Sequence, residues 1–211
     1  MEHLSLKEKA YRIIKEKLLK MEFEPGGRIR EDLLAEEISM SRTPVREAIN
    51  QLTAEGFINN IPRRGLFFIK IRQEEIKDLL DVREVLEILA VDKCIEKISA
   101  EQIKNLERIL DEIERSLKAG AYGHCNELDS LFHQEIAKIS RNKKLIDFCH
   151  DLEDYMHIAR AIEKEKYTQN KIKRSHEEHR LIVKCIKNKD KLGAKKAIRN
   201  NIMSMKRNLG I

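Results

Sequence analysis

Glycine and proline are concentrated at one end of the chain, and this placement limits the fold more than any other feature of the sequence. All three prolines and half of the eight glycines precede residue 70. Because both residue types interrupt helices and form turns, tight turns and strands are expected in the first part and long helices in the second. The change predicts a boundary near residues 71–74 and two domains, 1–72 and 73–211.

Apolar periodicity within 1–72 predicts three helices followed by a β-hairpin. The expected helices cover 6–20, 30–38 and 43–55, and the expected strands cover 57–60 and 66–71. In the third helix we expect Thr43 to be the N-cap, with Pro44 at the first helical position, where its missing N–H costs nothing. A helix, a helix-turn-helix and a hairpin in this order are typical of a winged helix-turn-helix, which binds DNA.

The second segment contains about six stretches with helical periodicity and no proline. The expected helices are 74–98, 99–119, 121–140, 143–165, 171–187 and 191–209. Ser99 and Gln102 have the spacing of a capping box at the start of the second of these helices. Because the connections are short, neighbouring helices should pack antiparallel. The sequence therefore predicts a mainly α protein, in which a winged helix-turn-helix with a small hairpin precedes an antiparallel bundle of about six helices.

The third expected helix has the side chains that a helix in the DNA major groove requires. A reading helix presents residues that reach base edges and phosphates from its N-terminal turn. The candidates are Arg42, Thr43, Arg46 and Asn50 on the helix, with Arg63, Arg64 and Gly65 at the hairpin tip. Residues 41–72 carry six basic side chains against two acidic ones, within a chain of net charge +6. The alternative is that these arginines are ordinary surface charges, but their joint placement favours DNA binding.

Four runs in the first segment are more specific than this general pattern. They are LAEEI (34–38), SRTPVREAI (41–49), EGFI (55–58) and PRRG (62–65). Together they resemble the signature of the GntR family of bacterial transcription regulators. The residues that approach DNA in that family correspond to Arg42, Thr43, Arg46 and Gly65. Many members carry arginine at the position of Asp32, so this contact is either absent here or supplied by Arg30 instead.

Three side chains in the helical segment are suitable metal ligands. Asp129 and His133 are four residues apart and share one helix face, and His179 lies on a later helix. Carboxylate and imidazole groups suit zinc, nickel, manganese or iron, and helical bundles hold such ions by inward-facing side chains. The alternative is that Asp129 and His133 form an ordinary pair within their helix. His176 is three residues from His179, not four as in a metalloprotease helix, and we interpret it as a surface or supporting residue.

Four further runs resemble the FCD ligand domain of the FadR subfamily. They are DVREVLE (81–87), DSLFH (129–133), EHRLI (178–182) and AKKAIRNN (194–201). Members of this subfamily typically hold a divalent metal through one Asp and three His, and a small carboxylate effector completes the site. The resemblance places three of these ligands at Asp129, His133 and His179, and the fourth at Asn201. Because an amide is a poor ligand for zinc or nickel, the site is weakened, favours manganese, or is lost.

Two arginines in the helical segment are candidates for effector binding. Arg83 lies among apolar residues of the first expected bundle helix, and an arginine near a cavity can bind a carboxylate through two hydrogen bonds. The resemblance supports this function, but an ion pair with Glu87, four residues on, is an equal alternative. Arg160 is a second candidate of the same kind.

These features predict a ligand-controlled repressor that binds a pseudo-palindromic operator as a homodimer. The alternatives are a regulator that senses the metal itself, and a metal-dependent enzyme fused to a DNA-binding head. No nucleophile–base pair or phosphate-binding loop supports an enzyme. The four cysteines form no CxxC pair, and no segment has the length of a signal peptide or membrane span. We therefore expect a cytoplasmic protein with reduced thiols.

Overall fold

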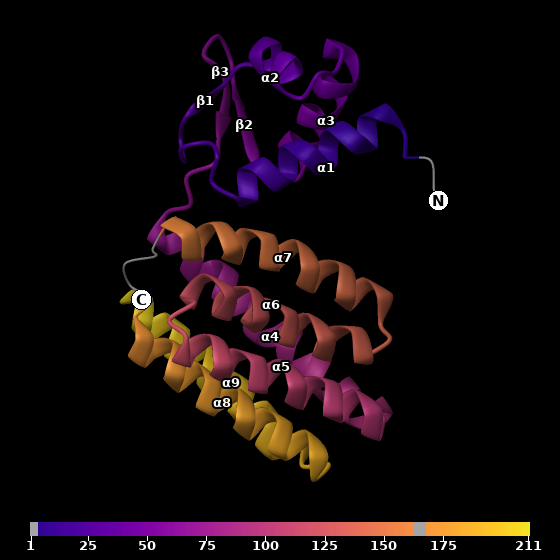
Figure 1. The fold of residues 1–211 in the computed structure, drawn as a ribbon, viewed down its shortest axis with the longest axis vertical. Helices are drawn as coiled ribbons and strands as arrows, with labels where there is room; N and C mark the ends of the chain where they lie inside the picture. Colours follow the sequence, from indigo (N-terminus) through magenta and orange to yellow (C-terminus); the bar gives the residue numbers. More distant parts are fainter. Residues whose placement is uncertain (1–3, 163–167) are drawn as a thin grey trace. The chain divides into compact units, whose positions relative to one another are not determined.

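A computed structural model describes residues 4–162 and 168–211 (Figure 1). The chain divides into two compact units, Met1–Arg72 and Gln73–Ile211. Helices dominate both units, and a single small sheet lies in the first, which confirms the predicted mainly α class. Within the described residues, no helix has the length and apolar character needed to cross a membrane. All four cysteines are free thiols, and three of them are buried.

The first unit is a winged helix-turn-helix, as the sequence predicts. Its elements are α1 (Leu6–Leu19), β1 (Arg28–Ile29), α2 (Glu31–Glu37), α3 (Arg42–Ala54), β2 (Ile58–Ile61) and β3 (Gly65–Phe68). The three strands form an antiparallel sheet in the order β1-β3-β2. The core contains Ile14 and Leu18 of α1, Ile49 and Leu52 of α3, and Phe68 of β3, each almost fully buried. This apolar packing holds α3 against α1 and leaves the other side of α3 facing solvent.

This unit differs from the sequence prediction in the end of β3, which stops at Phe68 and not at residue 71, in the start of α3 and in an extra strand. Helix α3 begins one residue before Thr43, because Ser41 is the last residue with an extended backbone (φ −68°, ψ 158°). Pro44 is still tolerated, since the N–H groups of the first helical turn have no partner within the helix. Strand β1 was not expected, because two residues are too few to show a period. It pairs Arg28 with Phe67 and Ile29 with Leu66.

The second unit is a bundle of six helices among the described residues, which confirms the predicted architecture. They are α4 (Gln73–Lys97), α5 (Ala100–Lys118), α6 (Tyr122–Ile139), α7 (Lys143–Ile162), α8 (Gln169–Lys187) and α9 (Lys191–Leu209). Helix α4 contacts α6, α7, α8 and α9, so it runs through the centre of the bundle. Its buried face nevertheless includes two charged residues, Arg83 and Glu87. The predicted end of the fourth bundle helix, at residue 165, lies outside the described residues.

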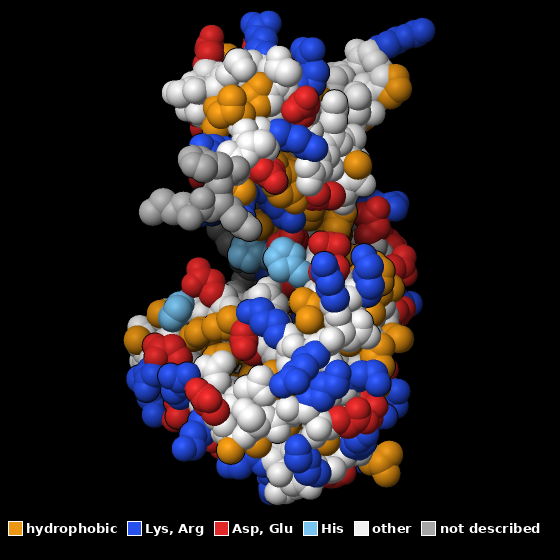
Figure 2. All heavy atoms as spheres, turned by 90° about the vertical axis from the view of Figure 1, so that its right-hand side faces the viewer, with side chains coloured by type: hydrophobic (Ala, Val, Ile, Leu, Met, Phe, Trp, Pro, Cys, Tyr) orange, Lys and Arg blue, Asp and Glu red, His pale blue; other side chains and the backbone are white. Residues whose placement is uncertain are grey.

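The surface of the helical unit is mixed in charge. Figure 2 shows basic and acidic side chains interspersed over the face it displays, with hydrophobic side chains in small groups between them. Many of the charged residues pair across helices, such as Lys187 with Glu107 and Arg199 with Glu84. Exposed pairs of this kind contribute little to stability, typically about 0–1 kcal/mol each. The unusual charges of this unit are therefore those in its interior.

Candidate functional site

The exposed face of α3 presents the predicted DNA-reading residues. Arg42, Thr43, Arg46 and Asn50 are all exposed, whereas Val45 and Ile49 on the opposite side are buried. At the wing tip, Arg63 and Arg64 are exposed, and Arg63 has a left-handed backbone with φ +63°. The fold thus leaves all the predicted α3 and wing side chains accessible to a ligand as large as a duplex.

Acidic residues of α2 hold two of the predicted arginines. The guanidinium of Arg46 binds the Glu31 carboxylate, with Nη2 2.7 Å from Oε1. Arg30 binds Asp32, with Nη2 2.7 Å from Oδ2. Arg42 and Arg63 have no acidic partner in the part of the chain that the structure describes. A carboxylate therefore holds Arg30 and Arg46, whereas Arg64 lies over the Phe67 ring, with Cζ 5.8 Å from its centroid.

Arg28 is a further basic residue of this surface that the sequence analysis missed. Its side chain lies against Gly65 at the start of β3, where an added Cβ would be 3.4 Å from Arg28 Nε. Gly65 also has φ +106°, a conformation that L side chains rarely adopt. Only the pairing of β1 with β3 brings Arg28 to the wing, and that pairing has no signal in the sequence.

In the second unit, Asp129 and His133 of α6 meet His179 of α8. His133 Nε2 lies 3.1 Å from His179 Nε2, and Asp129 Oδ1 lies 3.4 Å from the same atom. One ligand atom from each residue lies within 4.8 Å of the others. Ligands held about 2.1 Å from a metal ion are separated by about 3.0–3.4 Å, so the three atoms fit around one ion. The structure thus brings together the three residues that the sequence predicts as ligands.

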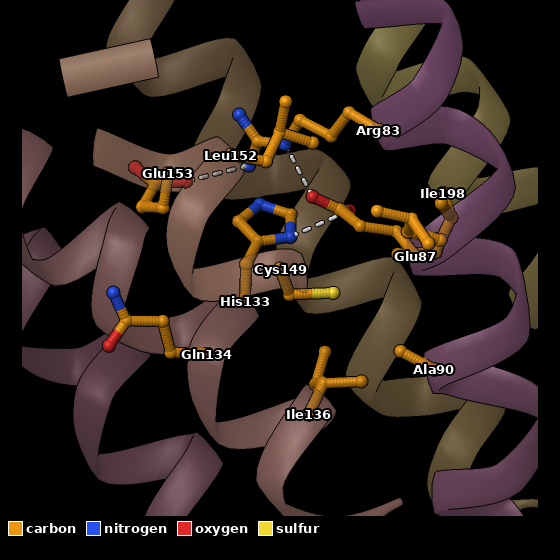
Figure 3. A pocket seen from close by; sticks show the side chains of 11 residues that line it. Arg83, Glu87, Ala90, His133, Gln134, Ile136, Cys149, Leu152, Glu153 and Ile198 are labelled. Carbon is orange, nitrogen blue, oxygen red and sulfur yellow. Dashed lines mark hydrogen bonds and ion pairs between the residues drawn. The ribbon is translucent and has the colours of Figure 1, made fainter. Parts of the chain in front are cut away.

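A carboxylate from α4 orients one of the two histidines. Glu87 Oε2 lies 2.8 Å from His133 Nδ1, close enough for an ion pair, but the two atoms do not have hydrogen-bond geometry (Figure 3). This carboxylate would stabilise a proton on Nδ1, and Nε2 would then be the lone-pair donor. Burial would raise the pKa of Glu87, but Arg83 and His133 outweigh it and lower that pKa to about 2. Burial lowers the pKa of His179 to about 3, so its imidazole is neutral near pH 7 and can bind a metal ion.

Asn201 of α9 lies beside this cluster, in contact with a second carboxylate. Its Nδ2 donates to Glu178 Oε2 at 2.9 Å, and Ser175 connects it to Asp129 through contacts of 3.5 and 3.4 Å. Because a carboxylate only accepts hydrogen bonds, Glu178 fixes the orientation of the amide. Asn201 Oδ1 is buried and makes no hydrogen bond within the described residues. A buried carbonyl oxygen without a partner is compatible with a cation ligand, although a weaker one than imidazole.

A network of buried ion pairs surrounds the cluster. Arg83 Nε donates to Glu87 Oε1 at 2.5 Å, so the ion pair that the sequence left open does form. Arg83 Nη2 also lies 3.7 Å from Glu153 Oε2 of α7, and Arg160 donates to the other oxygen of Glu153. Burial would raise the pKa of Glu153, but Arg160 and Arg83 lower it below its usual value. Glu153 is therefore a buried carboxylate that joins two guanidinium groups.

The two candidate effector-binding arginines line different cavities. Arg83 lines a small cavity of about 20 Å³ with His133, Cys149 and Glu153, which we call the His133 cavity (Figure 3). Arg160 lines one of about 40 Å³, the His179 cavity. The residues around it include Asp129, Lys171, Ser175, His176 and His179. His176 is buried and accepts a hydrogen bond from Arg180, so the interpretation of His176 as a surface residue is wrong, and the supporting one remains.

Comparison with known proteins identifies both units. Residues 6–68 match the model of bacterial regulatory proteins of the gntR family, and residues 78–203 match the FCD domain. The Nta operon transcriptional regulator of Aminobacter aminovorans is 32% identical, over 74% of this chain and 72% of that protein. The gluconate operon transcriptional repressor of Bacillus licheniformis is 31% identical, over 80% of this chain and 70% of that protein. The Escherichia coli McbR structure shares the fold with a TM-score of 0.85, at 22% identity over 98% of both chains.

Proposed function

Because this chain belongs to the GntR family of bacterial transcription regulators and carries an FCD domain, we propose that it is an effector-controlled repressor that binds its operator as a dimer. The gntR family model describes regulatory proteins, and the similar proteins are named as regulators, which also argues against the enzyme that the sequence left open. Repression is supported by the relatives named as repressors of a gluconate operon. The observation that carries the effector proposal is the buried Asp129–His133–His179 cluster beside Arg160.

Asp129, His133 and His179 would hold a divalent metal ion. Asn201 would add an oxygen donor only after its amide turned, because Nδ2 rather than Oδ1 contacts Ser175, which in turn contacts Asp129. A bound ion would supply positive charge and an open position for an oxygen of the effector. The amide and carboxylate oxygens suit manganese better than an all-nitrogen site would, while zinc and nickel remain compatible with the two imidazoles. Glu87 and Glu178 would act on the site indirectly, through His133 and Asn201.

Arg160 is the residue that we assign to the carboxylate of the effector. It is 5% exposed, and its Nε and Nη1 atoms make no hydrogen bond among the described residues. Both lie on a guanidinium that lines the His179 cavity, where a small carboxylate could accept from them. Both arginines already bind a carboxylate, Arg83 that of Glu87 and Arg160 that of Glu153. Arg160 keeps two guanidinium nitrogens without a hydrogen bond among the described residues, Nε and Nη1, whereas Arg83 keeps Nη2 alone. We therefore assign the effector carboxylate to Arg160 rather than to Arg83.

Helix α4 is the element that could transmit effector binding. It contacts the cluster through Glu87 and begins at Gln73, the first residue after the DNA-binding unit. An effector that favours one position of Glu87 and His133 would therefore bias the position of α4. In a repressor, the favoured position would be the one that is incompatible with operator binding.

Replacing His179 with alanine should remove the metal from the purified protein. The variant loses one of the two imidazoles, and its metal content by elemental analysis should fall from about one ion per chain to near zero. His124→Ala, which removes an exposed histidine of α6 that pairs with Glu127 and lines neither cavity, should keep its metal and serves as the control. Unchanged metal content in His179→Ala would contradict the ligand assignment.

Two regulatory mechanisms remain, an effector-controlled repressor and a metal sensor, and measuring DNA affinity against metal and carboxylate concentration distinguishes them. An effector-controlled repressor should release DNA only when metal and a carboxylate such as gluconate are both present. Release by metal alone would instead support the metal sensor. Release by carboxylate from a metal-free, chelator-treated protein would show that the arginines suffice.

The dimer is proposed to form through the exposed side of α4. Val82, Val85 and Leu89 are spaced at i, i+3 and i+7 on this helix and are exposed, Val85 by 68%. An apolar stripe of this kind on a helix is typical of a surface that packs against another protein. A second copy of the chain would cover it symmetrically, as a two-fold operator requires.

Val85→Glu should raise the dimer dissociation constant at least about 100-fold, because it places two carboxylates in an apolar two-fold interface. Analytical ultracentrifugation over a concentration series would measure the change. Leu192→Glu alters an even more exposed apolar residue on α9 and should leave the dimer intact. A Val85→Glu protein that remains dimeric at nanomolar concentration would place the interface elsewhere.

A further inference from the structure

Arg46 is held by a residue from outside its own helix. Glu31, the first residue of α2, faces Arg46 across the helix-turn-helix, fifteen residues away in the sequence. Arg46 Nε lies 2.9 Å from Oε1 and 3.2 Å from Oε2, and Nη2 lies 2.7 Å from Oε1. The carboxylate therefore binds one edge of the guanidinium, formed by Nε and Nη2.

This arrangement leaves the outer end of the guanidinium free. Arginine has five N–H donors in a rigid plane, and Glu31 occupies only those on the Nε–Nη2 edge. Both hydrogens of Nη1 and one of Nη2 remain, and these form the fork that spans O6 and N7 of guanine. Because the plane is rigid, fixing one edge also fixes the direction of the fork.

The exposure of the pair shows that its main effect is on orientation. The Arg46 side chain is 64% exposed and that of Glu31 is 22% exposed, and an ion pair so open to solvent adds little to folding stability. A free arginine side chain, however, loses rotamer entropy when it becomes ordered, and binding must overcome this loss. Glu31 removes part of that freedom before DNA arrives. The lower entropy cost therefore favours only a duplex in which a base pair lies in the direction of the fixed fork.

Glu31 also acts against DNA that does not match. A carboxylate at the reading surface repels phosphates and cancels the charge of Arg46 at long range, so it lowers the affinity for any duplex. Both effects increase the contrast between the operator and random DNA. We infer that Glu31 is a specificity-determining residue, which positions Arg46 for a base pair of the operator and reduces binding to unrelated sequence.

The adjacent residue provides a matched control. Asp32 also lies in the first turn of α2 and also holds an arginine, but its partner Arg30 precedes the helix and is not on α3. Asp32→Asn therefore removes one negative charge next to Glu31 without releasing Arg46. If Glu31 acts on DNA binding only through its charge, Glu31→Gln and Asp32→Asn should change binding equally. If Glu31 orients Arg46, only Glu31→Gln should change the discrimination between base pairs.

The experiment begins with an operator selected by the wild-type protein from a pool of random duplexes. Each base pair of the operator is then substituted, and the change in the dissociation constant is measured for the wild type and for Arg46→Ala. The positions that Arg46 reads are those at which a substitution weakens binding of the wild type but not of the variant. At such a position the wild-type dissociation constant should change by about ten- to a hundredfold on substitution. Glu31→Gln should reduce that ratio to a few-fold, while its affinity for random duplex stays equal or rises. Asp32→Asn should raise the random-duplex affinity similarly and keep the wild-type ratio.

Three results would overturn the inference. The first is a Glu31→Gln protein with the wild-type ratio at the positions read by Arg46. The second is an equal loss of discrimination at every operator position together with a lower melting temperature, which would indicate a purely structural effect. The third is the same loss of discrimination in Asp32→Asn. Glu31→Ala should behave like Glu31→Gln, which excludes an effect of the new amide.

Discussion

Replacing Arg46 with alanine should weaken operator binding by about two to four orders of magnitude, with the fold intact. Each bidentate contact between an arginine and a base is worth about 1–3 kcal/mol of discrimination, and a two-fold operator contains two such contacts. Arg46 is on the exposed face of α3, and its side chain is 64% exposed, so its removal should leave the core of the unit intact. Fluorescence anisotropy with labelled operator, at one fixed salt concentration, would measure the loss.

The salt dependence of binding distinguishes a base contact from a phosphate contact. If Arg46 reads a base, the alanine variant should bind random duplex nearly as well as the wild type does. If it neutralises a phosphate, random-duplex affinity should fall in parallel, and the salt slope should decrease by about one for each half-site. Arg12→Ala, an exposed arginine on α1, is the control and should change neither quantity. An Arg46→Ala dimer that still protects its operator would contradict the placement of α3 in the major groove.

The sequence predicts most of the fold because the apolar periods and the helix breakers agree. Ile49 and Leu52 repeat at helical spacing and are buried, and Gly56, just after the C-cap of α3, adopts the positive φ expected there. The start of α3 was misplaced because Ser41 and Thr43 are both good N-cap residues, and the side chain of neither distinguishes them. Strand β1 was missed because pairing with β3, rather than a local pattern, defines it.

The candidate site divides in the same way between local and distant pairings. The i, i+4 spacing places Asp129 with His133, and it also gives the alternative pair of Arg83 with Glu87, which the structure contains. No local pattern indicates that Glu31 holds Arg46, or that Glu153 joins two arginines of α4 and α7. Such contacts depend on how helices pack, and this information is spread over many apolar residues. The residues that meet at the candidate sites were therefore predictable where their spacing is local, but the acids that come from distant positions, Glu31 and Glu153, were not.

Replacing Glu153 with leucine should lower the free energy of unfolding of the helical unit by about 3–5 kcal/mol at pH 7. Removing one partner of a buried ion pair leaves the other charge without compensation, and this is the usual size of the penalty. Here two guanidinium groups lose a shared partner, since Arg160 donates to Glu153 and Arg83 lies 3.7 Å from it. Urea unfolding followed by circular dichroism would measure the change. Glu135→Gln, which breaks the exposed pair with Lys138, should cost less than about 0.5 kcal/mol.

The effect of Glu153→Leu should also depend on pH in a defined direction. Because the pKa of Glu153 is lower in the folded state than its ordinary value of 4.5, its stabilising effect is complete above about pH 4.5 and is lost as the pH falls through the folded-state value. The difference between wild type and variant should therefore be largest near neutrality and shrink in acid. The double variant Glu153→Leu, Arg160→Met should recover part of the loss, because it removes the newly unpaired charge as well. A single variant within about 1 kcal/mol of the wild type at pH 7, or a difference that grows in acid, would show that Glu153 is not the shared anion of the buried network.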